Sequence, residues 1–328
     1  MTFKIIYLAI TFAFTACNQP KNQTAVQTPA TPNIAAPAFD ADSAYAYVEK
    51  QTQFGPRVPN TDAHKACASY LSGELKRFGA TVTEQSATLK AYDGTPLESV
   101  NIIGSFKPEN PKRILLFAHW DSRPYADEDS NPDNHNKPIM GADDGGSGVG
   151  VLLEIARQIG MKAPDTGVDI IFFDSEDYGI PDFYNGPDIP GEWWCLGSQF
   201  WAKNPHVPGY KADFGILLDM VGTKNATFFK EQTSMRYAPN IVDKVWSKAR
   251  SLGYGKYFIN AKIGGITDDH QYVIEGRGIP SIDIINYDTD NDHGFGDYWH
   301  TQNDTMENID RETLKAVGQT VMEIVYEH

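Results

Sequence analysis

The stretch Gly141-Ala142-Asp143-Asp144-Gly145-Gly146-Ser147-Gly148 places two adjacent acids within a run of small residues. Apolar residues with helical spacing follow at once, over residues 149–159. The glycines allow positive φ and a close approach of other chain segments. By itself the stretch is typical of an acidic turn that caps a helix. A carboxylate fixed at the mouth of a helix can also bind a cation, so the rest of the chain decides between these interpretations.

Four short apolar runs elsewhere in the chain predict strands that are buried on both faces. The predicted strands span residues 113–118, 168–173, 214–218 and 281–285, and the predicted helices span residues 42–54, 62–78, 149–159, 198–202, 239–252 and 310–326. Two alternating segments, 81–92 and 98–106, predict a β-hairpin at an edge of the sheet. This order predicts one α/β domain, with a twisted, mixed and mostly parallel central sheet covered by helices on both faces.

The composition of the whole chain bounds its class and its partners. The chain has 328 residues, 41% of them hydrophobic, and a formal net charge of −15. Such a chain can build a large core. An acidic surface repels phosphate backbones, so we expect no nucleic-acid partner. The same surface attracts cations, including the positively charged N-terminal amines of peptides.

The N-terminal segment is typical of an export signal. Lys4 precedes an apolar run over residues 5–14, which is too short to span a bilayer, and Thr15-Ala16-Cys17 closes it. Small residues before a cysteine resemble a bacterial lipoprotein signal, with Cys17 as the lipidated first residue. The alternatives are a plain secretory signal cut nearby or a single free cysteine. We therefore predict a signal segment over 1–17, a disordered tether over 18–38 and a catalytic domain over 39–328.

The predicted domain is thus exported and soluble, and only the lipid on Cys17 attaches it to a membrane. We expect it in the periplasm or at the cell surface. An oxidising location permits a disulfide between the two other cysteines, Cys67 and Cys195. Two small buried apolar residues are an equally good interpretation of the pair.

Acids or histidines follow every predicted buried strand, where ligands of open α/β sheets bind. The side chains in question are His119 and Asp121, Asp174 to Asp177, Asp219, and His300 after the last strand and its loop. Each alone can cap a strand or a loop, but several carboxylates at one sheet edge without a cation carry a high desolvation cost. Histidine with carboxylates and without cysteine suits a catalytic Zn²⁺. Three long loops, 122–140, 179–194 and 286–298, are expected to be either functional or disordered.

The acids and histidines also carry a resemblance to a known family. The series His119-x-Asp121, Asp144, Glu176-Asp177, Asp219 and His300 resembles the zinc aminopeptidase fold. Further segments resemble one branch, the zinc-dependent glutaminyl-peptide cyclotransferases of animals and their bacterial relatives. These segments are Trp194-Cys195-Leu196-Gly197-Ser198, Leu217-Leu218-Asp219 with Gly222, Ile266-Thr267-Asp268-Asp269-His270, and Trp299-His300-Thr301 with Asn303-Asp304.

This resemblance implies a set of site residues and one zinc ion per chain. The implied zinc ligands are Asp144, Asp177 and His300, and the implied catalytic acid/base is Glu176. The resemblance also implies that Asp219 and Asp268 share a hydrogen-bond network with Glu176, and that Trp299 and Trp194 line the substrate pocket. Asp143 matches no ligand position and is expected either to pack beside the ligands or to face solvent. The animal enzymes have glutamate at position 177 and a histidine at position 283, where this chain has Asp177 and Asp283.

The implied reaction converts the N-terminal glutamine of a peptide or protein to pyroglutamate and releases ammonia. The main alternative is a zinc aminopeptidase, because all five ligands of a dinuclear site, His119 and Asp219 included, are present in the sequence. The Trp299-His300 pair and the Asp268-Asp269-His270 segment favour the cyclotransferase. A non-catalytic lipoprotein that uses the fold for binding is the third interpretation, and the retained ligands and acid/base argue against it.

Overall fold

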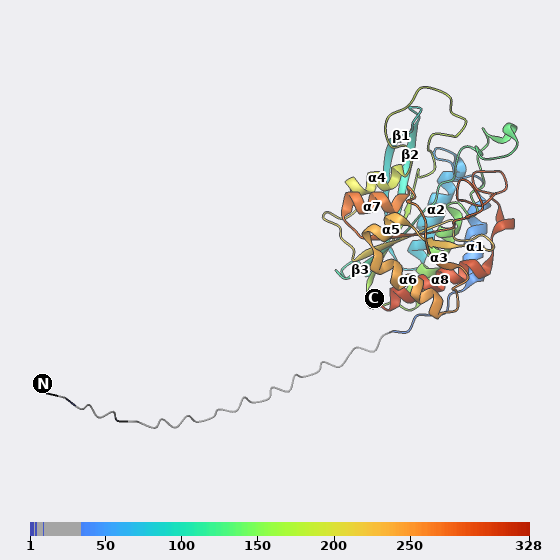
Figure 1. The fold of residues 1–328 in the computed structure, drawn as a ribbon. Helices are drawn as coiled ribbons and strands as arrows, with labels where there is room; N and C mark the ends of the chain where they lie inside the picture. The colour runs from blue at the N-terminus through green and yellow to red at the C-terminus, as the bar shows by residue number, and fades with distance from the viewer. Residues whose placement is uncertain (3, 5–8, 10–33) are drawn as a thin grey trace. The chain divides into compact units, whose positions relative to one another are not determined.

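The computed structural model describes residues 1, 2, 4, 9 and 34–328 (Figure 1). Cys17 and nearly all of the predicted signal segment and tether therefore lie outside the described residues. Residues 34–38 lie against the domain, since Lys162 Nζ donates a 2.7 Å hydrogen bond to the Ala35 carbonyl and Gln319 Nε2 donates to the Pro37 carbonyl at 3.2 Å. Among the described residues, no helix is both long and apolar enough to span a membrane.

A six-stranded mixed sheet forms the centre of the domain, in the order β1-β2-β4-β3-β5-β8. Strands β1, β2 and β4 are antiparallel, and β4, β3, β5 and β8 run parallel. The strands of this sheet are β1 (Thr81–Lys90), β2 (Pro96–Phe106), β3 (Arg113–His119), β4 (Gly167–Phe173), β5 (Phe214–Asp219) and β8 (Ser281–Ile285). A small two-stranded sheet consists of β6 (Phe228–Lys230) and β7 (Phe258–Lys262).

Helices cover both faces of the sheet (Figure 1). The larger apolar core includes buried residues of α1, α2, α3, α6 and α8, and the smaller core on the other face includes residues of α4 and α7. The helices are α1 (Ala41–Thr52), α2 (Asp62–Arg77), α3 (Gly146–Met161), α4 (Leu196–Lys203), α5 (Gln232–Tyr237), α6 (Pro239–Ser251), α7 (Asp269–Arg277) and α8 (Arg311–Tyr326). Short 3-10 helices span Pro132–Asn134 and Met306–Asn308.

Polar side chains fix the starts of the helices. The Asp40 carboxylate accepts hydrogen bonds from two backbone N–H groups of α1. The Thr61 hydroxyl and the Asp310 carboxylate each accept one from the first turn of α2 and of α8. Such caps satisfy N–H groups that have no partner within the helix and contribute about 1 kcal/mol each.

The parallel register brings the polar strand ends together. His119 lies opposite Phe173, and Asp219 lies opposite Ile285. Strands β3 and β5 pair with Phe117 opposite Leu217, so His119 and Asp219, two residues further along each strand, reach the same level. The carboxyl ends of all four parallel strands therefore face one space.

The predicted fold class is confirmed, including the hairpin at the sheet edge and a mostly parallel sheet. The four predicted buried strands agree with the structure to within one residue at each end. Helix α3 begins at Gly146, three residues earlier than predicted, because the small residues carry no apolar periodicity. The short elements α5, α7, β6 and β7 had no predicted counterpart.

Both cysteines of the described domain, Cys67 and Cys195, are free and fully buried. The structure therefore has two small buried residues at these positions and not the disulfide that the sequence also allowed.

Helix α3 packs directly on the sheet at Gly148, which fixes the position of the acidic turn that precedes it. A Cβ atom at Gly148 would lie 2.1 Å from the Leu218 carbonyl oxygen in β5 and 3.0 Å from the Ala118 Cβ in β3. These are backbone and strand atoms that cannot move aside without shifting the sheet.

We predict that Gly148→Ala lowers the free energy of unfolding by about 2–3 kcal/mol, because helix and sheet must separate. Urea denaturation measures the change. Gly73→Ala in α2 is the matched control, since nothing lies within 4 Å of its Cβ position. The control should raise stability by about 0.5–1 kcal/mol, the usual effect of Ala for Gly within a helix. Equal stability of wild type and Gly148→Ala would show that the close contact of α3 with the sheet does not require glycine at position 148.

Candidate metal centre and pocket

A cavity of about 390 Å³ opens at the carboxyl edge of the parallel strands. Its lining combines acids at the base with aromatic and apolar side chains around them. The acids and histidines of the lining are Asp144, Glu176, Asp177, Asp219, Asp268, His293 and His300. Segments that are far apart in the sequence supply them: the turn before α3, the ends of β4 and β5, the start of α7 and the loop after β8.

Three of these residues, Asp144, Asp177 and His300, form a buried group whose potential ligand atoms all lie within 4.8 Å of one another. His300 Nε2 is 3.6 Å from Asp144 Oδ2 and 3.4 Å from Asp177 Oδ1. Both carboxylate oxygens of Asp177 are buried and accept no hydrogen bond from any described residue. Two carboxylates and an imidazole converging in this way fit Zn²⁺. The structure thus brings together the three ligands that the sequence predicts.

An ion pair behind His300 orients its ring. His300 Nδ1 lies 3.3 Å from Asp127 Oδ1, which also accepts a 2.7 Å hydrogen bond from Arg123 Nε. Burial alone would raise the pKa of Asp127, but hydrogen bonds from Arg123 and His300 outweigh it and hold the pKa below its ordinary value. Asp127 is therefore negatively charged. By holding Nδ1 of His300, it directs Nε2 toward Asp144 and Asp177.

The acidic turn is anchored through its backbone and through Asp143. The Asp304 carboxylate accepts hydrogen bonds from the N–H groups of Asp143 and Asp144, at 2.8 and 3.1 Å. The Asp143 carboxylate accepts from the Gly222 N–H at 2.7 Å and from the Tyr298 hydroxyl at 2.5 Å. Asp143 is fully buried, so it packs beside the ligands and does not face solvent. Burial raises its pKa to about 7.

Gly145 explains why the turn needs a residue without a side chain. Its φ is +80°, and a Cβ would lie 2.7 Å from the Asp121 carbonyl oxygen and 2.9 Å from His119 Cε1. The Asp121 carboxylate in turn accepts from the N–H groups of Glu176 and Asp177, at 3.1 and 3.2 Å. The turn, β3 and the end of β4 are thus packed as one unit around the ligand group.

Glu176 lies at the edge of the ligand group, with 12% of its side chain exposed. Its Oε1 is 3.0 Å from the sulfur of Cys195, and its Oε2 is 3.9 Å from His119 Nδ1. Burial, together with the charges of neighbouring acids such as Asp177 and Asp268, raises the pKa of Glu176 well above its ordinary value. A carboxyl group in this environment can accept and release a proton.

The two other predicted acids reach the site in different ways. Asp219 Oδ1 lies 3.2 Å from His119 Nε2, and no hydrogen bond among the described residues joins Asp219 directly to Glu176. Asp268 caps α7 through Oδ1, which accepts a 2.6 Å hydrogen bond from the Asp269 N–H. A potential ligand atom of Asp268 lies within 4.8 Å of one on Glu176, and Asp268 Oδ2 has no hydrogen-bond partner among the described residues.

His119 links two groups of acids. Its Nε2 lies 3.0 Å from Asp144 Oδ1, and the potential ligand atoms of His119, Asp144 and Asp219 all lie within 4.8 Å of one another. Burial lowers the pKa of His119, but hydrogen bonds to its acidic neighbours outweigh burial and leave the pKa well above its ordinary value. The ligand set that the aminopeptidase alternative requires for a second metal ion is therefore also assembled.

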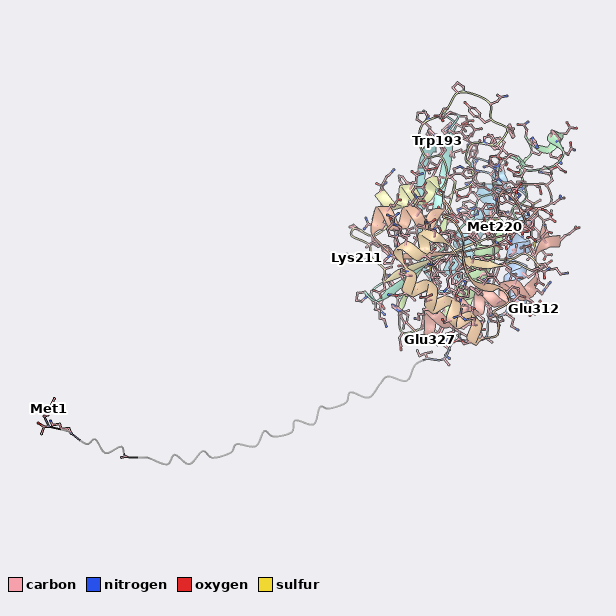
Figure 2. All side chains as sticks on the ribbon, in the orientation of Figure 1. Met1, Trp193, Lys211, Met220, Glu312 and Glu327 are labelled. Atoms are coloured by element: carbon pink, nitrogen blue, oxygen red, sulfur yellow. The ribbon has the colours of Figure 1, made fainter. Side chains whose placement is uncertain are left out.

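Left-handed backbone at non-glycine residues is concentrated at this edge of the sheet. Ser175, Cys195, Met220 and His300 have φ of 56°, 56°, 46° and 51°. Met220 directly follows Asp219 and lies in the interior of the molecule (Figure 2). Each such conformation costs about 1 kcal/mol or more and persists only where the surroundings fix it. The site therefore stores strain in the residues that aim its functional groups.

Aromatic rings form the walls of the pocket. The Trp299 ring stacks on the His300 ring with centroids 3.7 Å apart, and the Trp194 ring lies nearly parallel to the His300 ring with centroids 6.1 Å apart. The Arg123 guanidinium lies 4.5 Å from the centroid of the Trp194 ring. Both predicted pocket tryptophans thus lie beside a predicted zinc ligand.

Sequence reasoning missed four residues that organise the site: Arg123, Asp127, Tyr298 and Asp304. Arg123 and Asp127 belong to the 122–140 loop, whose length and polarity predicted a role without indicating which side chains carry it. Asp304 stood within a quoted motif but had no assigned contact.

Comparison with known proteins places this geometry in a family. Residues 101–325 match the model of Peptidase family M28. The chain belongs to this family. The M28 chain is 71% identical to a solved Zn-dependent exopeptidase from Parabacteroides distasonis, with a TM-score of 0.88 over 90% of this chain and 100% of that chain. It is 66% identical to a solved glutaminyl cyclase from Tannerella forsythia, with a TM-score of 0.87 over 89% and 100% of the two chains.

The more distant relatives include both an aminopeptidase and a glutaminyl-peptide cyclotransferase. An aminopeptidase of Bacillus subtilis is 29% identical over 281 residues, which cover 83% of this M28 chain and 54% of that protein, so the chain spans about half its length. A glutaminyl-peptide cyclotransferase of Bos taurus is 26% identical over 303 residues, which cover 83% and 78% of the two chains. The resemblance inferred from the sequence is confirmed.

We predict that Asp127→Ala weakens zinc binding to this M28 chain about 10- to 100-fold, the usual effect of removing the carboxylate behind a histidine ligand. Competition with a fluorescent zinc chelator measures the dissociation constant. Asp188→Ala, at an exposed residue of the 179–194 loop, is the control and should bind zinc like the wild type. Unchanged zinc affinity in Asp127→Ala would show that His300 is not a zinc ligand or that Asp127 does not orient it.

Proposed function

We propose that this M28 chain is a glutaminyl-peptide cyclotransferase, which converts the N-terminal glutamine of peptides or proteins to pyroglutamate and releases ammonia. The observation that carries the proposal is the high sequence identity to a solved glutaminyl cyclase along nearly the whole domain. The pocket supports it, because an acid/base, a three-residue ligand group and aromatic walls enclose one small space.

One zinc ion per chain is part of the proposal, held by Asp144, Asp177 and His300. When bound there, it would supply Lewis-acid polarisation of the substrate's side-chain amide. The donor set supports this assignment, since both Asp177 oxygens are buried and accept no hydrogen bond from the described residues.

The proton transfers fall to Glu176. The α-amino nitrogen of the substrate bonds to its own side-chain amide carbon, and the bond from that carbon to the amide nitrogen breaks. Glu176 accepts one proton from the attacking amine and donates it to the leaving nitrogen, so ammonia departs and the carboxyl group returns to its initial state. Asp268 adds negative charge near Glu176 and helps to keep its pKa raised, and Asp219 raises the pKa of Asp268 in the same way.

The apolar walls favour cyclisation over hydrolysis. Trp194, Trp299, Phe295 and Ile266 line the cavity around the acids. The nucleophile and the amide belong to one residue, so a pocket that folds the glutamine side chain supplies most of the required proximity. The same walls exclude water from the reacting amide.

The second candidate is a zinc aminopeptidase, favoured by the assembled group of His119, Asp144 and Asp219. A peptidase would use zinc-activated water to cleave the first peptide bond. The proposed cyclotransferase leaves that bond intact.

A single assay separates the two activities. The purified domain is incubated with a glutamine-initiated dipeptide, and ammonia and free amino acids are followed together. Ammonia release without peptide cleavage is the expected result. Release of free glutamine would overturn the proposal in favour of the peptidase, and neither product from a zinc-loaded domain would indicate a binding protein.

We predict that Glu176→Gln lowers kcat at least about 100-fold, because the amide cannot take up the proton of the attacking amine. The variant should still hold one zinc ion per chain, measured by native mass spectrometry, since Glu176 is not among the proposed ligands. Glu109→Gln, at an exposed residue of the turn between β2 and β3, is the control and should retain full activity. Wild-type turnover by Glu176→Gln would rule out the assigned acid/base.

We also propose that the chain is exported and anchored by a lipid on Cys17. The charge of Lys4, the apolar run over residues 5–14 and the Thr15-Ala16-Cys17 end support this. The acidic domain would then meet exported substrates that begin with glutamine.

Labelled palmitate fed to lipoprotein-processing bacteria is expected to enter the full-length chain and to be absent from Cys17→Ser. The variant should also move from the membrane fraction to the soluble fraction. Cys67→Ser, which changes a buried cysteine of the domain, should keep the label. A wild-type chain without label, or a labelled Cys17→Ser chain, would contradict the proposal.

A further inference from the structure

Cys195 contacts Glu176 through both its backbone and its side chain. Its backbone N–H donates a 2.9 Å hydrogen bond to the Glu176 carbonyl, and its sulfur lies 3.0 Å from Glu176 Oε1. Cys195 is fully buried, and its φ of 56° is one of the left-handed conformations at the site. The strained backbone therefore aims the sulfur at one oxygen of the proposed acid/base.

The sulfur carries a proton that it can donate. Burial and the nearby negative charges of Glu176 and Asp269 raise the pKa of the Cys195 thiol well above its ordinary value. A thiol is a weak donor, and Glu176 Oε1 is the acceptor at hydrogen-bond distance.

The carboxylate of Asp268 lies beside Glu176 and Cys195, and its free oxygen indicates which kind of group the substrate brings there. Potential ligand atoms of Glu176, Cys195 and Asp268 all lie within 4.8 Å of one another. Asp268 Oδ1 is engaged by the Asp269 N–H, whereas Asp268 Oδ2 is buried and has no partner among the described residues. With Oε1 of Glu176 engaged by the thiol, two acceptors remain for a donor brought by the substrate: Asp268 Oδ2, and Glu176 Oε2, which lies 3.9 Å from His119 Nδ1 and makes no hydrogen bond to it. A primary amine has the required hydrogen atoms.

We propose that Cys195 is a positioning residue of the reaction: its S–H group holds Glu176 Oε1, so that Oε2 exchanges protons with the substrate's α-amino group next to Asp268. This inference rests on the proposed cyclotransferase function. It assigns the proton transfers to one named oxygen of Glu176. It also gives a purpose to a free cysteine inside an active-site pocket, where the size and weak polarity of sulfur allow both packing and donation.

Two substitutions at Cys195 separate donation from packing. Cys195→Ala removes the donor and should lower kcat about three- to tenfold, the range expected for one weak hydrogen bond, with KM little changed. Cys195→Ser keeps a donor at nearly the same place and should retain kcat within about twofold. Cys67→Ala is the matched control, because it removes the same sulfur from a fully buried site in α2 and should keep the wild-type kcat.

Thermal unfolding and zinc content of each variant are measured beside the kinetics. A drop in melting temperature that is equal in Cys195→Ala and Cys67→Ala, with kcat lost only in Cys195→Ala, supports positioning. Wild-type kcat in Cys195→Ala overturns the inference. Equal loss of kcat in the serine and alanine variants also overturns it, because packing alone would then explain the effect.

Crystal structures of the variants test the contact without any activity. Glu176 is expected in one orientation in wild type and Cys195→Ser, and in more than one in Cys195→Ala. A single unchanged orientation in Cys195→Ala would overturn the inference even if the chain proves to be a cyclotransferase. A wild-type enzyme that fails to cyclise glutamine would instead refute the proposed function, and the crystallographic comparison would still decide the role of the thiol.

Discussion

The burial of several carboxyl groups in one small space is the constraint on which the rest of the structure depends. Burial raises the pKa of Asp177 to about 6 and raises the pKa of Glu176 and Asp268 well above their ordinary values. Such a cluster is costly unless positive charge or hydrogen-bond donors compensate it. The structure supplies both: the Arg123 guanidinium lies 3.6 Å from an oxygen of Asp177, and His119 and His300 stand between the acids. A cation held by Asp144, Asp177 and His300 would complete the balance.

Backbone N–H groups provide the second part of this compensation. Asp121 and Asp304 each accept hydrogen bonds from two successive N–H groups, and these pairs belong to the residues that carry the site, Glu176-Asp177 and Asp143-Asp144. Acids that bind backbone in this way fix the loop and leave the functional carboxylates free to point into the cavity. The buried polar groups are therefore divided into those that hold the chain and those that face the ligand.

The sequence was informative wherever local pattern and tertiary structure agree. The buried strands are predictable because parallel strands covered on both faces are apolar throughout, and the edge that carries the site is predictable because acids and histidines follow those strands. The choice of Asp144, Asp177 and His300 as zinc ligands came from the family resemblance. The short helix α7 could not be found, since its nine residues carry no clear apolar face. The Arg123–Asp127 pair could not be found either, because an ion pair within an irregular loop has no periodicity. Tertiary packing imposes the left-handed backbone at Met220 and His300, so it cannot be predicted from the residue type.

The chain's departure from the animal enzymes at position 177 has a physical explanation in the way this residue is held. Aspartate reaches one methylene less far than glutamate, so its backbone must lie closer to the other ligands. The Asp177 N–H donates to Asp121, and the Asp177 carbonyl accepts a 3.0 Å hydrogen bond from Arg123 Nη1, so the backbone is fixed on both sides of the side chain. Arg123 also engages Asp127, which supports His300. One buried arginine therefore sets the separation of two proposed zinc ligands. The shorter aspartate fits this role because its backbone is positioned by the same group that orients the histidine.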